Sequence, residues 1–123
     1  MGTRSLTFVG ENAGQPIINL YRQYDGYMEG HGAELAAFLN GIRVGNGLPG
    51  DTTGFANGMG CLAAQIVAHF KTEAGHFYLH HPSETDCGQD YTYHVYPNQV
   101  IVRSHGSLVF DGTWDEFHEA AYA

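Results

Sequence analysis

Residues 57–75, NGMGCLAAQIVAHFKTEAG, contain the clearest helix signal in the chain. The apolar side chains recur at the helical spacing i, i+3, i+4, i+7, i+8 and i+11, which gives one buried stripe. They are Met59, Leu62, Ala63, Ile66, Val67 and Phe70. Asn57 can cap the start of this helix, Lys71 falls in its last turn, where the dipole favours a cation, and Gly75 follows.

The sequence before this helix predicts a β-hairpin and a shorter helix. Residues 5–9 alternate polar and apolar side chains, and residues 17–24 are rich in β-branched and aromatic ones, with turn-forming residues between them. Residues 33–39 have helical spacing and are followed by Gly41. Residues 43–58 contain five glycines, which indicates a long loop of the kind that is often functional or mobile.

The sequence after this helix predicts strands and a last helix. The expected strands are residues 76–81, 91–96, 100–104 and 107–110. Thr113 and Glu116 match a capping box, which starts a helix over residues 114–121.

Strands and helices therefore occur in blocks, which is typical of an α+β fold and not of a parallel βαβ fold. We expect residues 1–123 to form a single domain. Its antiparallel sheet would consist of an N-terminal hairpin and a C-terminal meander. Two central helices and a C-terminal helix would pack on one face of this sheet.

Charge restricts the partners of the chain. Its 123 residues carry 13 acidic and 5 basic side chains, a net charge of −8. This balance argues against direct binding of nucleic acid or of an anionic membrane surface. We find no signal peptide and no apolar run long enough to span a membrane, so we expect a cytoplasmic protein. In that compartment Cys61 and Cys87 would be free thiols.

Residues 20–39, LYRQYDGYMEGHGAELAAFL, resemble a family of small phage, prophage and bacterial proteins. Members often open with MGTR, as this chain does, and the similarity continues through residues 57–65 and 69–71, up to about Tyr96. Met28 stands where the family often has proline. The resemblance implies a phage or bacterial setting, with the host cytoplasm as the location of a phage-encoded protein, and it implies no particular reaction.

The same segment is the densest group of candidate ligand-binding side chains. They are Tyr21, Arg22, Tyr24, Asp25, Tyr27, Glu29, His31 and Glu34. Glycines between them could let backbone amides approach an anion at a helix start, arginine could pair with phosphate, and tyrosines could stack on a base. The alternative is purely architectural: a tight turn at Asp25, half-buried tyrosines, and a histidine that flanks the helix.

The histidines suggest a metal site only weakly. Strand alternation places His80 on one face of its strand and His94 on one face of the next, together with Thr92 and Tyr96. If these strands pair, the two imidazoles could share a metal. Zinc needs three or four ligands, and no metal-binding motif is present. We therefore predict no metal and no cofactor.

The sequence also favours a non-enzymatic role. Glu84, Asp86 and Asp90 should raise the pKa of the Cys87 thiol, which is unfavourable for a nucleophile, and Cys61 lies on a helix. A Glu29–His31 acid–base pair is conceivable but not specific, so we assign no catalytic residues. Acidic residues also gather between positions 111 and 119, where they could face a basic protein or simply cap a helix.

These observations lead to three hypotheses. The first is a non-enzymatic phage or prophage accessory protein that sequesters a small nucleotide-like ligand to counter host defence. In so small a chain, a pocket between the protomers of a homo-oligomer would suit this role. The second is an acidic inhibitor that docks on a basic surface of a host defence protein. The third is a small metal-assisted hydrolase.

Overall fold

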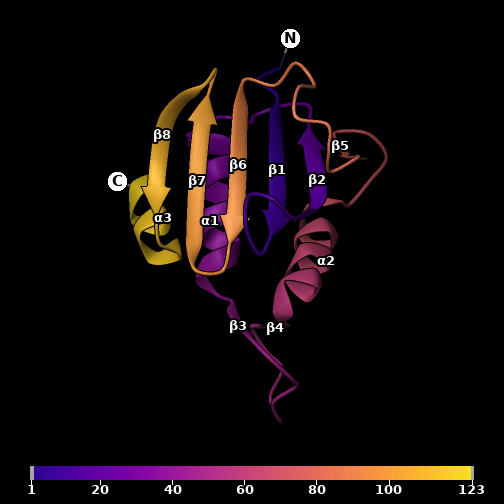
Figure 1. The fold of residues 1–123 in the computed structure, drawn as a ribbon, viewed down its shortest axis with the longest axis vertical. Helices are drawn as coiled ribbons and strands as arrows, with labels where there is room; N and C mark the ends of the chain where they lie inside the picture. Colours follow the sequence, from indigo (N-terminus) through magenta and orange to yellow (C-terminus); the bar gives the residue numbers. More distant parts are fainter. Residues whose placement is uncertain (1, 123) are drawn as a thin grey trace.

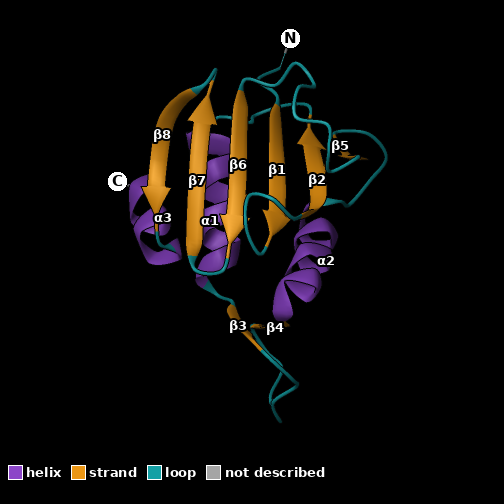
Figure 2. Cartoon of the chain, viewed as in Figure 1, coloured by secondary structure: helices purple, strands orange, loops and turns teal. Residues whose placement is uncertain are grey.

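The computed structural model describes residues 2–122 and has a six-stranded sheet with helices on one face (Figures 1 and 2). The strand order is β5-β2-β1-β6-β7-β8. The strands of this sheet are β1 (Ser5–Gly10), β2 (Pro16–Arg22), β5 (Phe77–His80), β6 (Tyr91–Tyr96), β7 (Gln99–Ser104) and β8 (Ser107–Gly112). The α-helices are α1 (Ala33–Asn40), α2 (Gly58–Phe70) and α3 (Trp114–Ala121), and a short π-helical segment, η1 (Met28–Gly32), precedes α1. The α+β fold expected from the sequence is confirmed.

Strand pairing joins the N-terminal hairpin to the C-terminal meander at the centre of the sheet. The predicted hairpin β1–β2 and the meander β6–β7–β8 are both antiparallel. They are linked by a parallel pair, in which Phe8 of β1 lies opposite His94 of β6. The expectation of an antiparallel sheet is therefore correct except at this junction. β5 does not join the meander but pairs with β2 at the opposite edge.

The hydrophobic core lies between the sheet and the helices. Helix α2 contributes Leu62 and Ile66, both fully buried, and α3 contributes Phe117. The sheet contributes side chains such as Val9 and Val95 to the same cluster. Burying each such side chain stabilises the fold by about 1.5–3 kcal/mol. No helix within residues 2–122 is long and apolar enough to cross a bilayer.

The helix ends agree only in part with the sequence signals. Thr113 and Glu116 form the predicted capping box, with both hydrogen bonds present. The prediction that Asn57 caps α2 is wrong, because its side chain makes no cap bond. Its Oδ1 accepts a hydrogen bond from the backbone N–H of Gly47 instead. The side chain of Asn57 therefore stabilises the preceding loop and does not cap the helix.

The long loop predicted over residues 43–58 is more regular than its glycine-rich composition indicates. It contains two short strands, β3 (Arg43–Gly45) and β4 (Phe55–Asn57), which pair in parallel. In Figure 1 the segment between them extends away from the large sheet.

Candidate functional site

The face of the sheet opposite the helices carries aromatic and polar side chains. Strand alternation sends Val9 and Val95 into the core and turns Phe8 and His94 to the other face. Helices cover only the first of these faces. The second face is therefore where a ligand could reach the sheet.

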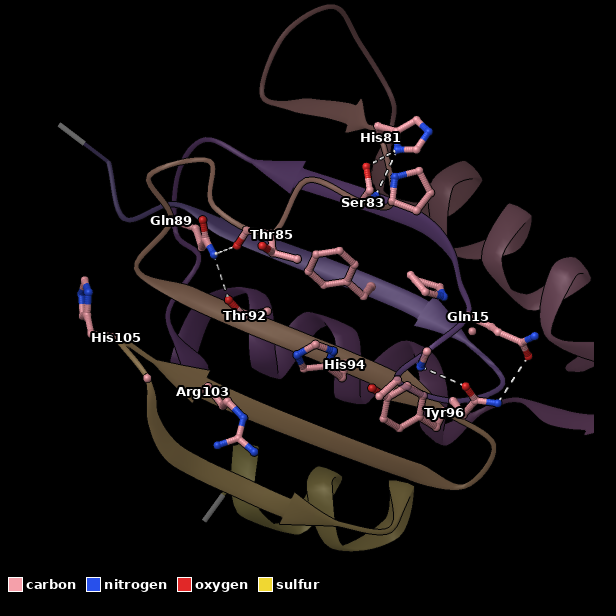
Figure 3. A pocket seen from close by; sticks show the side chains of 18 of the residues that line it. Gln15, His81, Ser83, Thr85, Gln89, Thr92, His94, Tyr96, Arg103 and His105 are labelled. Atoms are coloured by element: carbon pink, nitrogen blue, oxygen red, sulfur yellow. Dashed lines mark hydrogen bonds between the residues drawn. The ribbon is translucent and has the colours of Figure 1, made fainter.

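A cavity of about 660 Å³ lies on this face (Figure 3). Its floor comes from β1, β6 and β7, and its walls come from residues 10–16, the loop 81–90 and the turn at His105 and Gly106. This volume falls within the range of small-molecule pockets, roughly 300–1,000 Å³. Elements far apart in the sequence thus build one concave site.

A row of rings forms part of the floor. The Phe8 and His94 rings are stacked, with centroids 5.4 Å apart and planes 12° apart. His94 and Tyr96 continue the row at 6.0 Å and 27°. Aromatic faces of this kind can stack on a planar ligand.

The ionisation states in the cavity follow from burial. Burial, and then the positive charge of Arg103, lowers the pKa of His94, so its imidazole is neutral at pH 7. Burial raises the pKa of Tyr96, so its hydroxyl stays protonated. The rings therefore offer neutral hydrogen-bonding groups beside a single guanidinium.

Among the arginines and lysines of residues 2–122, Arg103 is the one that lines this cavity. Arg22 pairs with Glu34, Arg43 lies over the ring of Phe55, and Lys71 donates hydrogen bonds to backbone carbonyls. Within residues 2–122, no ion pair or hydrogen bond engages the side chain of Arg103. Arg103 lines the cavity, and its exposed side chain is free to meet an anion.

The predicted ligand-binding segment is arranged differently from this cavity. It brings together Arg22, His31 and Glu34, which form an internal network on the helix side. Nη1 of Arg22 donates hydrogen bonds to Nδ1 of His31 and to Oε1 of Glu34, at 3.2 and 2.8 Å. Both Arg22 and His31 are buried. This group links β2 to the segment before α1.

The remaining predicted residues are dispersed. Tyr21 is buried on the open face beside His80, and Tyr24 is exposed against His76. The Tyr27 hydroxyl donates to Asp25 in an exposed turn. Glu29 is exposed as well. Neither described cavity is lined by any residue of the predicted segment, and ligand binding there stays a prediction.

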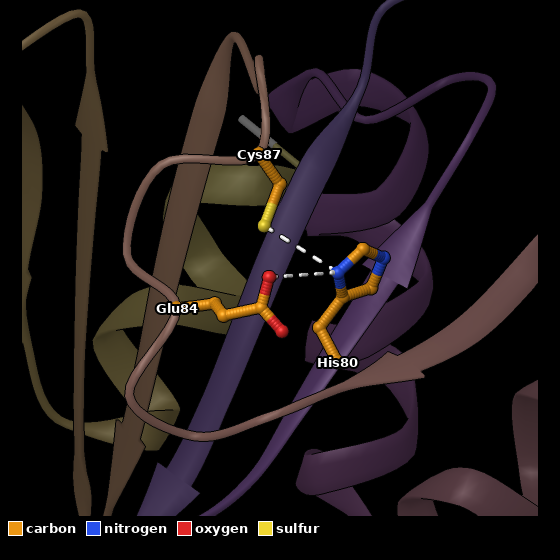
Figure 4. Close-up of side chains that lie close together, drawn as sticks. All are labelled: His80, Glu84 and Cys87. Carbon is orange, nitrogen blue, oxygen red and sulfur yellow. Dashed lines mark hydrogen bonds and ion pairs between the residues drawn. The ribbon is translucent and has the colours of Figure 1, made fainter.

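The condition for a metal shared by His80 and His94 is not met, because β2 and β1 lie between their strands. His80 lies instead beside Glu84 and Cys87 (Figure 4). Both cysteines are free. The pKa of Cys87 is raised as expected, chiefly by burial and then by the carboxylates of Glu84 and Asp86.

The acidic cluster near the C-terminus is partly used within the fold. Asp111 accepts a hydrogen bond from Gln99, and Glu116 belongs to the capping box of α3. These contacts favour the structural interpretation of the cluster over docking on a basic partner.

Comparison with protein-family models, with curated proteins and with solved structures gives no match. The site must therefore be interpreted from its own chemistry. Sequence alternation already placed Thr92, His94 and Tyr96 on one face. The contribution of Phe8 and Arg103 depends on strand pairing, which the sequence did not reveal.

Proposed function

We propose that the chain binds and sequesters a small, planar, anionic ligand of the nucleotide class in the cavity on the open face of the sheet. The observation that carries this proposal is the combination of the ring row at Phe8, His94 and Tyr96 with the unengaged guanidinium of Arg103 in one cavity.

Each part of the cavity matches a part of such a ligand. A base can pack against the ring row at His94, which is its half-buried member. The planar fork of Arg103 can donate two parallel hydrogen bonds to a phosphate. The hydroxyl of Thr92, which also lines the cavity, can donate a hydrogen bond to a sugar or to the edge of a base.

Sequestration without chemical change is the form of the function we propose. The resemblance to phage and bacterial proteins suggests the setting, in which removal of a host signalling nucleotide would counter a defence response. A sequestering protein acts stoichiometrically and releases its ligand intact. Recovery of the unchanged nucleotide after denaturation, checked by chromatography, distinguishes this role from turnover.

The test is calorimetric titration with a panel of nucleoside mono-, di- and cyclic phosphates. Arg103→Gln and Arg43→Gln form a matched pair, because both remove one positive charge but only Arg103 lines this cavity. We expect Arg103→Gln to weaken binding by roughly tenfold or more, since hydrogen bonds to charged groups contribute about 1.5–3 kcal/mol. Arg43→Gln should bind as the wild type does.

Truncation of a ring supplies a second arm of the test. His94→Ala should also weaken binding, because it interrupts the stack between Phe8 and Tyr96. Failure of the whole panel to bind the wild-type chain, or equal weakening by the two arginine substitutions, would contradict the proposal.

A further inference from the structure

A second cluster of reactive side chains lies beside the cavity, at the end of β5. Nδ1 of His80 lies 3.6 Å from Sγ of Cys87 and 3.8 Å from Oε2 of Glu84 (Figure 4). One ligand atom from each residue lies within 4.8 Å of the other two. We propose that His80, Glu84 and Cys87 bind a divalent transition-metal ion of the zinc type.

The spacing fits a tetrahedral ion. Zinc lies about 2.3 Å from a thiolate sulfur and about 2.0–2.2 Å from nitrogen or oxygen, which places neighbouring ligands roughly 3.3–3.6 Å apart. The two distances from His80 already approach this value. The side chain of Glu84 is about half exposed, so a small shift of Oε2 can close the remaining gap.

The distance between His80 and Glu84 is long for a direct interaction, whereas the contact between His80 and Cys87 is within the range of a hydrogen bond to sulfur. A separation of 3.8 Å between nitrogen and a carboxylate oxygen exceeds the usual hydrogen-bond range of about 2.7–3.2 Å. An exposed ion pair at that distance contributes little to stability. An ion placed between the groups would satisfy the imidazole, the carboxylate and the sulfur together.

The donor set indicates which metal would bind. Sulfur and imidazole ligands favour zinc and similar ions, whereas calcium and magnesium prefer oxygen alone. Three protein ligands leave one tetrahedral position for water or another ligand. Binding would require loss of the thiol proton of Cys87, which passes to the solvent when the metal–sulfur bond forms.

The backbone that carries the ligands is fixed by buried or half-buried amides. Asn19, which is fully buried, donates hydrogen bonds from Nδ2 to the carbonyls of His81 and Glu84. Oε1 of Gln89 accepts from the backbone N–H of Cys87. The loop is therefore already held in the arrangement that brings the three ligands together.

The ligand side chains are also oriented. The ring of His80 packs against Tyr21, with centroids 5.1 Å apart. Oε1 of Glu84 accepts a hydrogen bond from the backbone N–H of His81, which leaves Oε2 facing the imidazole. Such supporting contacts are typical of metal sites, because they position the ligands before the ion arrives.

Metal binding would link the end of β5 to the loop that forms one wall of the cavity. Ser83, Thr85 and Gln89 of this loop line the cavity, in alternation with the proposed metal ligands. The proposal does not depend on the nucleotide ligand, because metal uptake can be measured with the metal alone.

The test is titration of tag-free, metal-depleted protein with Co²⁺, followed by displacement with Zn²⁺. We expect uptake of one equivalent, with absorption of a tetrahedral ion and a thiolate-to-cobalt charge-transfer band. Cys87→Ser should abolish that band, and His80→Ala and Glu84→Gln should each weaken binding by at least about tenfold, since even loss of an outer-shell partner has such effects.

Two control variants separate the site from the other thiol and from an imidazole elsewhere in the fold. Cys61→Ser and His69→Ala, both on α2, should bind Co²⁺ as the wild type does. Far-UV circular dichroism checks that each variant is folded, and His80→Ala keeps the proposal testable if Cys87→Ser is not. A band that persists in folded Cys87→Ser, or no tetrahedral signal from the wild type with Co²⁺ in large excess, would overturn the proposal.

Discussion

Nδ1 of His31 lies 3.2 Å from Nη1 of Arg22, on the buried side of the turn that precedes α1. Arginine can only donate, so Nδ1 must accept and the proton of the neutral ring lies on Nε2. Nε2 then donates to Oγ1 of Thr7, 2.8 Å away. A neutral imidazole therefore links β1, β2 and the start of α1.

This arrangement predicts that acid weakens the fold through His31. Burial, and then the charge of Arg22, lowers the pKa of His31 from 6.5 to about 3. Between these values the unfolded chain binds a proton that the folded chain does not, so the free energy of unfolding falls as the pH falls. The loss should reach about 2 kcal/mol at pH 5.

Urea unfolding at pH 8 and pH 5 measures this effect. His31→Asn should be less stable overall but should lose less stability between the two pH values than the wild type does. His69→Asn, at an exposed position of α2, should keep the wild-type dependence. An unchanged acid dependence in His31→Asn would contradict the assignment.

A pair of glycine substitutions should have opposite effects. A Cβ at Gly26 would lie 2.8 Å from Cβ of Ser5 and 2.9 Å from the carbonyl carbon of Arg4, so Gly26→Ala should destabilise the fold by about 1–3 kcal/mol. Gly60 lies in α2 with nothing within 4 Å. There Gly60→Ala should increase stability by up to about 1 kcal/mol. The midpoints of denaturant unfolding measure both effects. Midpoints that shift in the same direction in the two variants would be inconsistent with this packing.

Asn19 should control the order of the loop 81–90. Its Nδ2 donates to two loop carbonyls, at 3.3 and 2.8 Å. Asn19→Ala leaves these carbonyls without that donor, which should lower stability by about 1–3 kcal/mol and speed hydrogen exchange in residues 81–90. Asn40→Ala, at an exposed position in α1, should leave exchange in the loop unchanged. Equal exchange in the two variants would show that other contacts hold the loop.

The thiol of Cys87 should react slowly with alkylating reagents near neutral pH. Its pKa is raised by burial and then by Glu84 and Asp86, and the thiolate is the reactive form. In a Cys61→Ser background with chelator present, Glu84→Gln should lower this pKa and speed alkylation at a fixed pH. Glu73→Gln, an exposed site beyond α2, is the matched control. If the two carboxylate variants react alike, Glu84 does not act on this thiol.

Local signals predicted most of the elements. The apolar stripe of α2 and the capping box of α3 are each set by neighbours within a few residues, so the sequence reveals them directly. The parallel pairing of β1 with β6 depends on contacts between residues such as Phe8 and His94, which are remote in the chain. No local pattern indicates which of several strands will be the partner.

The candidate site was harder to predict for the same reason. The Tyr21–Glu34 segment contains many chemically capable side chains, but alternation in β2 sends Tyr21 and Arg22 to opposite faces of the sheet. The cavity combines residues of β6 with Phe8 of β1 and Arg103 of β7, which are remote in the sequence. A group of chemically capable side chains that is dense along the sequence is therefore a weak guide to where such side chains gather in the folded chain.

The parallel junction of β1 and β6 also restricts the order in which the chain can fold as it is made. β1 leaves the ribosome early, yet the strand that covers its free edge begins only at Tyr91. Until then the outer edge of β1 has no partner strand, and the nascent chain has no complete sheet on which α1 and α2 can pack. The complete sheet can therefore form only after β6 has emerged.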